Sequence, residues 1–101
     1  MEKGDCFAVE RGQYAGKFIV YIGAYGNRYQ FLMMPGNFQI LSLSDRELKF
    51  AQEDTLIQGV PPYMNFVENL PQDVFSVIES QYNEIKKSGL KAITSITLAR
   101  K

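Results

Sequence analysis

Residues 17–34, KFIVYIGAYGNRYQFLMM, contain two apolar runs separated by a break that is rich in glycine. The runs extend from Phe18 to Ile22 and from Tyr29 to Met34, and β-branched and aromatic residues are prominent in them. The dipeptide Gly26-Asn27 lies between the runs and tolerates the positive φ angles that a two-residue hairpin loop needs. This stretch therefore predicts a β-hairpin, around which the rest of the chain has to be arranged.

Both faces of this hairpin are apolar. Alternate side chains of a strand point to opposite faces, so the first arm presents two separate apolar sets. These sets are Phe18, Val20 and Ile22 on one face, and Ile19 and Tyr21 on the other. An antiparallel hairpin with two apolar faces has to be covered twice. We expect a second sheet layer or a curled barrel on one side, and a helix or a partner on the other.

Strand patterns also flank the hairpin. Residues 4–10 alternate, with Phe7 and Val9 on the face opposite Cys6, and residues 38–43 alternate in the same way. The breakers at 35–37 separate this last strand from the hairpin. Four consecutive strands joined by tight turns form a meander, which is the usual beginning of a small barrel.

The segment after the meander is ambiguous. Ser44 and Glu47 are three residues apart and resemble a helix capping box, whereas residues 48–50 alternate in polarity as a strand would. We predict a turn at 44–46 followed by a short edge strand, with a helical turn as the alternative. Residues 55–60 are a further candidate for a short extended segment.

Residues 59–70, GVPPYMNFVENL, predict a loop. The two consecutive prolines exclude a helix and remove ladder donors, so the backbone should be extended with few partners of its own. Tyr63, Met64 and Phe66 follow directly. Their side chains either fold over the mouth of the barrel as a lid or form an exposed aromatic patch where a partner docks.

Residues 71–88 carry clear helical signals. Pro71 is suited to the first turn, and Gly89 is a common residue just after a helix end. Apolar residues recur at the helical period at Phe75, Ile78, Tyr82 and Ile85, with Val74 beside them. We predict an amphipathic helix from Pro71 to Ser88 that covers one apolar face of the hairpin, and then a closing strand from Leu90 to Leu98.

The length and composition fit one folded domain over residues 1–101. The chain has 46% hydrophobic and 22% charged residues, close to the average of globular proteins. The predicted fold class is α+β, with a bent antiparallel meander of the SH3-like or half-barrel kind, one C-terminal amphipathic helix and a final strand. Apolar runs are far shorter than the roughly 20 residues that span a bilayer, and a lone cysteine forms no internal disulfide. We therefore expect a cytoplasmic protein.

Charge is unevenly distributed along the chain. Residues 44–84 contain eight acidic and two basic residues, whereas residues 85–101 contain five basic residues and no acidic one. Such segregation can create a dipolar surface that steers a charged partner. It can also reflect acids near the start of a helix and lysines near its end, which suit the helix dipole.

Catalytic signatures are missing from the sequence. The chain has no histidine and one cysteine, Cys6, so it contains no histidine-based catalytic group and no CxxC motif. Its glycines are spaced as turns between strands and form no phosphate-binding loop. Nearby acids such as Glu53 and Asp54 fit solvated turn residues, and Cys6 fits a thiol of the core. We expect no enzymatic activity, no cofactor and no metal.

A nucleic-acid surface is one alternative. Tyr14, Lys17, Tyr21, Arg28 and Tyr29 could form a basic and aromatic strand surface of the kind that small barrels use. Phosphate binding usually requires a strong basic excess, and the net charge of this chain is zero. A nucleic-acid or small-ligand binding barrel therefore ranks second.

The opening GDCFAVERGQYAGKFIVYIG resembles the first hairpin of small barrel-like immunity proteins from bacterial toxin systems. The positions that carry the resemblance are Gly4, Asp5, Phe7, Ala8, Gly12, Tyr14 and Gly16. They cover about the first fifth of the chain. Lys17 stands where those proteins commonly have a further glycine. The resemblance implies a protein that neutralises a toxin by covering its active surface.

A toxin inhibitor requires shape and charge complementarity and no catalytic residues. An acidic segment with aromatic anchors would suit a basic toxin such as a nuclease. The residues that we expect to bind the partner are Asp45, Glu47, Glu53, Asp54, Tyr63, Phe66 and Glu68. A phage-encoded inhibitor of a host defence would have the same properties, so the sequence leaves both possibilities open.

Overall fold

The computed structural model describes residues 1–10, 14–34, 39–52, 64–89 and 93–94 of the 101-residue chain. Its elements are β1 (Asp5–Val9), β2 (Phe18–Tyr25), β3 (Arg28–Met34), β4 (Gln39–Ser44), α1 (Asp45–Gln52), β5 (Met64–Asn69), α2 (Gln72–Lys87) and β6 (Ile93–Thr94). The six strands form one sheet in the order β5-β1-β2-β3-β4-β6. The predicted α+β fold, with its four-stranded antiparallel meander and C-terminal helix, is confirmed.

The central hairpin forms as the sequence predicts. Tyr25 of β2 faces Arg28 of β3, so Gly26-Asn27 is a two-residue loop. Gly26 has a φ of 65°, while no non-glycine residue in the described part of the chain has a positive φ. Positive φ at the first loop residue alone is the pattern of a type II′ turn, which matches the twist of the strands. The register then shifts between Tyr21 and Gly23, which marks a β-bulge.

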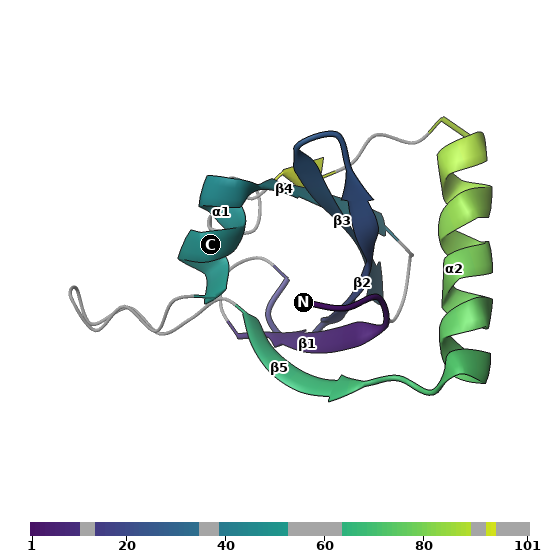
Figure 1. Cartoon of the computed structure of the whole chain (residues 1–101), viewed down its shortest axis with the longest axis horizontal. Helices are drawn as coiled ribbons and strands as arrows, with labels where there is room; N and C mark the ends of the chain where they lie inside the picture. Colours follow the sequence, from purple (N-terminus) through teal and green to yellow (C-terminus); the bar gives the residue numbers. More distant parts are fainter. Residues whose placement is uncertain (11–13, 35–38, 53–63, 90–92, 95–101) are drawn as a thin grey trace.

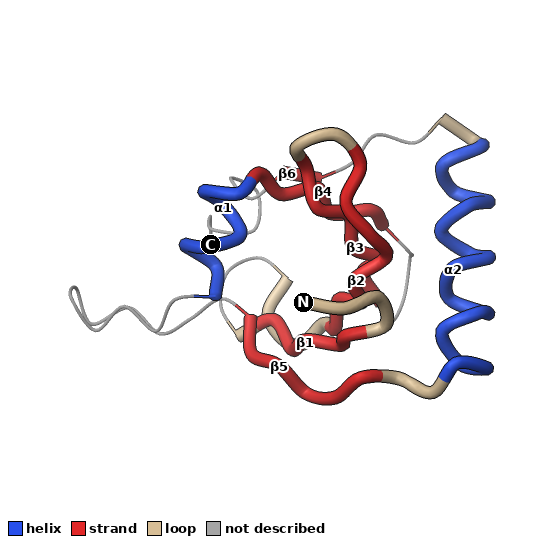
Figure 2. Tube along the Cα trace, viewed as in Figure 1, coloured by secondary structure: helices blue, strands red, loops and turns tan. Residues whose placement is uncertain are grey.

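The sheet curls into an open arc and does not close into a barrel (Figures 1 and 2). α1 lies across the open side of the arc, between β4 and the beginning of β5 (Figure 1). α2 lies outside the arc, along its convex face (Figure 1). The two apolar faces of the hairpin are therefore covered in different ways, by the curl of the sheet with α1 on the concave side and by α2 on the convex side.

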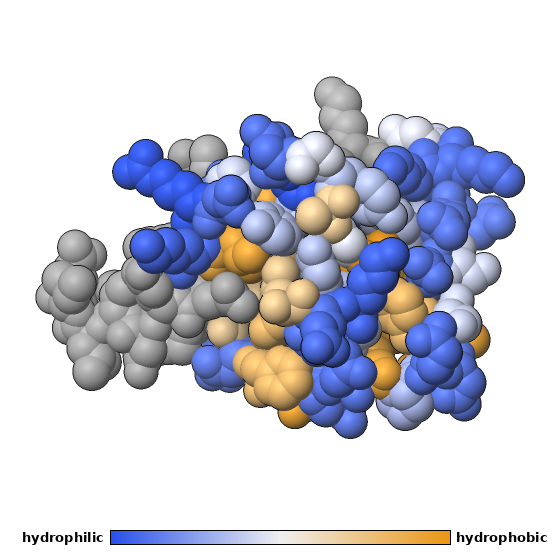
Figure 3. All heavy atoms as spheres, viewed as in Figure 1, coloured by the Kyte–Doolittle hydropathy of each residue, from blue (hydrophilic) through white to orange (hydrophobic). Residues whose placement is uncertain are grey.

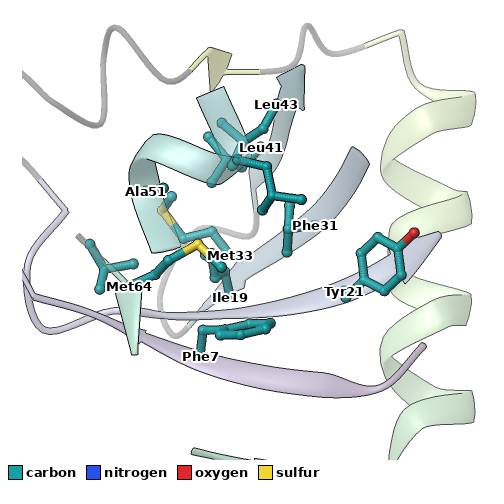
Figure 4. Close-up of a cluster of buried hydrophobic side chains, with 11 residues drawn as sticks. Phe7, Ile19, Tyr21, Phe31, Met33, Leu41, Leu43, Ala51 and Met64 are labelled. Carbon is teal, nitrogen blue, oxygen red and sulfur yellow. The ribbon is translucent and has the colours of Figure 1, made fainter. Parts of the chain in front are cut away.

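The concave core collects one face of every strand from β5 to β4. Figure 4 shows these side chains pointing toward one another inside the arc. Phe31 lies at the centre, with its ring 5.4 Å from that of Tyr21 and 6.2 Å from that of Phe7. The buried members are Phe7, Val9, Ile19, Tyr21, Phe31, Met33, Leu41, Leu43, Leu48, Ala51 and Met64.

The convex core lies between the sheet and α2. The helix begins after Pro71, ends before Ser88 and is followed by Gly89 at a φ of 82°, so the predicted helix is confirmed with its ends. All four residues of the predicted stripe are buried. The buried members of this core are Cys6, Val20, Ile22, Leu32, Ile40, Phe75, Ile78, Tyr82 and Ile85.

The structure corrects the prediction of a turn at 44–46 and an edge strand after it, because Ser44 is the last residue of β4 and Asp45–Gln52 form helix α1. The backbone N–H of Glu47 donates to Ser44 Oγ at 3.2 Å, and the backbone N–H of Ser44 donates to the Glu47 carboxylate at 2.9 Å. This reciprocal capping box satisfies donors that a helix start would otherwise leave unpaired. It outweighs the local alternation of polarity at 48–50.

The structure also corrects the prediction of a loop over residues 59–70, since Met64–Asn69 form strand β5. The prolines had predicted few backbone partners for this segment, but β5 pairs with β1 along its length. Met64 is buried in the concave core, whereas Phe66 is exposed. Tyr63 and the predicted extended segment 55–60 lie outside the described residues.

The predicted closing strand from Leu90 to Leu98 is not established. Residues 93–94 form β6, which pairs in parallel with Leu41 and Ser42 of β4. The remaining residues of the predicted strand lie outside the described part of the chain.

Candidate functional site

An apolar pocket lies on the convex face, between the first half of α2 and the end of the sheet formed by β5 and β1. Its volume is about 490 Å³. Figure 3 shows apolar atoms around the opening between the sheet and α2. The lining comes from β1, β2, β3, β5, α2 and the segment between β5 and α2: Cys6, Phe18, Met34, Val67, Glu68, Leu70, Val74 and Ile78.

An irregularity in β5 shapes one wall of this pocket. Cys6 is paired with Glu68 and Phe7 with Phe66, so Val67 is an extra residue without a counterpart on β1. Such a bulge changes the direction of a side chain at a sheet edge. Val67 and Glu68 consequently both line the pocket, next to Cys6.

The floor of the pocket carries a protonated thiol. Cys6 is buried, and its pKa is raised above its usual value, first by burial and then by the negative charge of Glu68. Because the thiolate is the nucleophilic form of cysteine, this environment suppresses its reactivity. The side chain of Cys6 therefore contributes apolar surface to the pocket.

β5 is a second candidate site because it forms one edge of the sheet as far as the chain is described. Phe66 on this strand has 59% of its surface exposed, and its ring lies edge-on to that of Phe7 at 5.7 Å. Two side-chain amides of β5 donate hydrogen bonds to carboxylates in or next to β1: Asn69 to Asp5 at 2.9 Å, and Asn65 to Glu10 at 2.8 Å. An exposed aromatic ring is thus held on a fixed strand.

The acids at the start of α1 interact mainly within the fold. The Glu47 carboxylate accepts from the Arg28 guanidinium at 3.1 Å, in addition to its capping bond. Asp45 accepts from the hydroxyl of Tyr29 at 2.5 Å, and this hydrogen bond, with the charge of Asp45, raises the pKa of Tyr29. Asp45 is itself exposed, so one side of its carboxylate faces solvent.

The structure separates the predicted partner-binding residues into two groups. Asp45 and Glu47 begin α1, next to β4, whereas Phe66 and Glu68 lie on β5 at the opposite edge of the sheet (Figure 1). Glu53, Asp54 and Tyr63 lie outside the described residues. α1 contacts both β4 and β5, and Phe66 with Glu68 makes the more exposed of the two groups.

The residues considered for nucleic-acid binding do not share one accessible surface. Tyr21 is buried in the concave core, and Tyr14 and Tyr29 are partly buried against the same core. The guanidinium of Arg28 donates to the hydroxyl and the carbonyl of Ser42 as well as to Glu47. Much of its hydrogen-bonding capacity is thus used within the fold, although the side chain is 39% exposed.

Sequence reasoning missed the pocket because its lining comes from separate strands and a helix. The one available signal was Val74, which stands beside the buried stripe of α2 and is 42% exposed. Within the described ranges, no group of three or more potential metal-ligating side chains occurs. None of the helices among these residues has the length and apolar character to cross a membrane.

Comparison of the chain with models of protein families, with curated proteins and with solved structures finds no match.

Proposed function

We propose that this protein is a non-catalytic inhibitor of the immunity type, which neutralises a toxin or a defence effector by binding to it. The observation that carries this proposal is the exposed surface of β5, where Phe66 is accessible and Glu68 follows on the same edge strand. We name Phe66, Val67 and Glu68 the β5 surface.

Interface energetics support a role for this surface. Aromatic side chains that enter a pocket of the partner dominate many protein interfaces, and charges around them set orientation and association rate. Phe66 is already fixed by its contact with Phe7 and by the pairing of β5 with β1, so little side-chain freedom is lost on binding. Glu68 adds a negative charge that complements a basic partner.

The acids at the start of α1 have a secondary role in this proposal. Asp45 is exposed, but its carboxylate already accepts a hydrogen bond from Tyr29, and the charge of Glu47 is already paired with Arg28. Such groups contribute more to steering than to the energy of a tight contact. The α1 acids therefore add long-range attraction for a basic partner.

Co-expression with the protein encoded by the neighbouring gene tests the proposal. We expect a stoichiometric complex and, where that protein is toxic, restored growth. Phe66→Ala should weaken the complex by about 2 kcal/mol, the usual threshold for an interface hot spot. Val77→Ala is the control, because Val77 is an exposed apolar residue on α2, outside the β5 surface.

Two results would contradict the proposal. One is an unchanged affinity after Phe66→Ala combined with Glu68→Lys. The other is tight binding of the purified chain to an oligonucleotide that weakens steeply with salt, which would favour the nucleic-acid alternative.

A further inference from the structure

The apolar pocket on the convex face combines an exposed rim with a buried floor. Phe18, Val67 and Val74 at the rim are 41%, 47% and 42% exposed, so three of the most exposed large apolar side chains of the described chain surround one hollow. Cys6 and Ile78 at the floor are buried. This concentration of accessible apolar surface differs from the scattered apolar residues that are normal on a protein surface.

The size of the pocket suits a small molecule. Its volume of about 490 Å³ lies within the range of roughly 300 to 1,000 Å³ that is typical of ligand pockets. Such pockets are lined mainly by apolar side chains, with few polar groups that fix the orientation of the ligand. The described lining here follows this pattern, since Glu68 is its one charged member.

Glu68 selects the charge of the occupant. Within the described part of the chain no basic side chain pairs with its carboxylate, and Cys6, its counterpart on β1, is a neutral thiol at neutral pH. A carboxylate next to apolar, weakly polarisable surface interacts more strongly with a cation than it would in open water. The same carboxylate repels an anion and gives nothing to a neutral apolar molecule.

We propose that this pocket binds a small apolar molecule that carries one cationic amine. The apolar part lies between Phe18, Val67 and Val74, and the ammonium group pairs with the Glu68 carboxylate. The pocket shares Val67 and Glu68 with the β5 surface but does not include the ring of Phe66, which lies on the opposite face of β5 with Phe7. Substitution of Phe66 therefore tests the proposed binding of a protein without changing the pocket.

Three probes with the same octyl chain test this assignment: octylamine, octanol and octanoate. Each is titrated into the intact chain at neutral pH, and binding is followed through the backbone amide resonances of Cys6, Val67 and Val74. We expect octylamine to bind most tightly, octanol less tightly and octanoate least. The Glu68→Gln substitution should lower the affinity for octylamine by about two- to fivefold, the factor that corresponds to a partly exposed ion pair. It should leave the affinity for octanol unchanged.

A pair of variants on one helix locates the site. Val74→Phe fills the pocket from its rim and should remove the binding of both octylamine and octanol. Val77→Phe places the same side chain one turn away at a position that is 69% exposed and does not line the pocket, and it should leave binding unchanged. Both positions are exposed, so neither variant should disturb folding.

The proposal is overturned if octanoate binds as tightly as octylamine, or if Val74→Phe and Val77→Phe have equal effects. It is also overturned if no probe binds while Val74→Phe weakens a complex with a protein partner, because the pocket would then receive a side chain of that partner. Phe66→Ala should leave octylamine binding unchanged. Failure of this inference and failure of the proposed protein binding are thus distinguishable.

Discussion

The two faces of the curled sheet are covered to different degrees. On the concave face, residues such as Ile19, Phe31 and Leu41 have no exposed surface, and α1 closes the open side of the arc. Val20, Ile22 and Leu32 on the convex face are equally buried. On the convex face, α2 is anchored at its second half, where Tyr82 stacks on Tyr25 at 6.5 Å and Lys86 lies 4.6 Å from the Tyr25 ring centre. Its first half also packs on the sheet through Phe75 and Ile78, and it borders the apolar pocket, where Val74 stays exposed.

Buried apolar surface stabilises the fold, whereas apolar surface that remains accessible can bind a ligand or a partner. The described members of the concave core are buried side chains, so their apolar surface contributes to the free energy of folding. The convex face has a buried core of its own but retains accessible apolar surface at the pocket, which is available to a ligand. Phe66 adds exposed apolar surface on the other face of β5, where a partner can reach it.

Truncation at the centre of the concave core should have the largest effect. Phe31→Ala removes a fully buried ring that contacts Phe7 and Tyr21, and should lower the free energy of unfolding by about 3 to 5 kcal/mol. Phe18→Ala makes the same change at the exposed rim of the pocket and should lose less than about 1 kcal/mol. Urea denaturation of both variants measures the difference, and equal losses would contradict the separation of the two faces.

A matched pair of isoleucines compares the faces directly. Ile19→Ala in the concave core and Ile78→Ala at the floor of the pocket remove the same atoms. Such changes cost about 2 to 5 kcal/mol, and more where a closed cavity remains. We expect the loss of unfolding free energy to lie near the upper end of this range for Ile19→Ala and near the lower end for Ile78→Ala, because the space at Ile78 opens to solvent. A larger loss at Ile78 in thermal or chemical unfolding would show that the convex face is the better packed of the two.

Loss of the α1 capping box should loosen the closure of the concave face. Ser44→Ala removes the acceptor for the Glu47 N–H and should destabilise the chain by about 1 kcal/mol. Ser80→Ala is the control, because Ser80 is an exposed position within α2. If both variants unfold at the same denaturant concentration, α1 does not contribute to the closure.

The smallest effect concerns the pH dependence of the convex face. Because folding raises the pKa of Cys6 above its usual 9.0, the neutral thiol is favoured in the folded state. Its contribution to stability is complete below that value and is lost as the pH rises through the higher folded pKa. The wild type should therefore lose more stability than Cys6→Ala between about pH 8 and pH 10. Denaturation at both pH values measures this, and parallel losses would contradict it.

Glu68→Gln provides an internal check on the electrostatics of the pocket. Since the charge of Glu68 is the second cause of the raised pKa, its removal should move the Cys6 pKa part of the way toward its usual value. Ultraviolet absorbance of the thiolate during a pH titration follows the change. An unmoved titration would mean that burial alone sets the pKa.

The parts of the fold that the sequence predicts are those with short-range patterns. Gly26-Asn27 predicts the hairpin loop because only a few residue types accept its backbone angles, and the stripe from Phe75 to Ile85 predicts α2 because its period is unambiguous. The segment from Ser44 contained two competing local signals. The capping box proved stronger there because its two hydrogen bonds satisfy the helix start.

β5 and the pocket depend on contacts between distant parts of the chain. Asn69 and Asp5 pair although 64 residues separate them in the sequence, and no local pattern near the prolines indicates that pairing. The bulge at Val67 likewise depends on the register with β1. The predicted acidic site rested on the charge distribution along the sequence, whereas in the fold Asp45 begins helix α1 and Glu68 lies on strand β5.

Residue-resolved amide hydrogen exchange tests the central claim, that the paired interior of the sheet carries the stability while the pocket and β5 present accessible surface. We predict that amides in the paired interior of β2 and β3 exchange only through global unfolding. Amides in Asn65–Glu68 and in the first half of α2 should exchange through smaller openings, at least about tenfold faster. If these amides instead exchange as slowly as those in the interior of β2 and β3, the pocket and β5 are as well protected as the centre of the sheet and the central claim is contradicted.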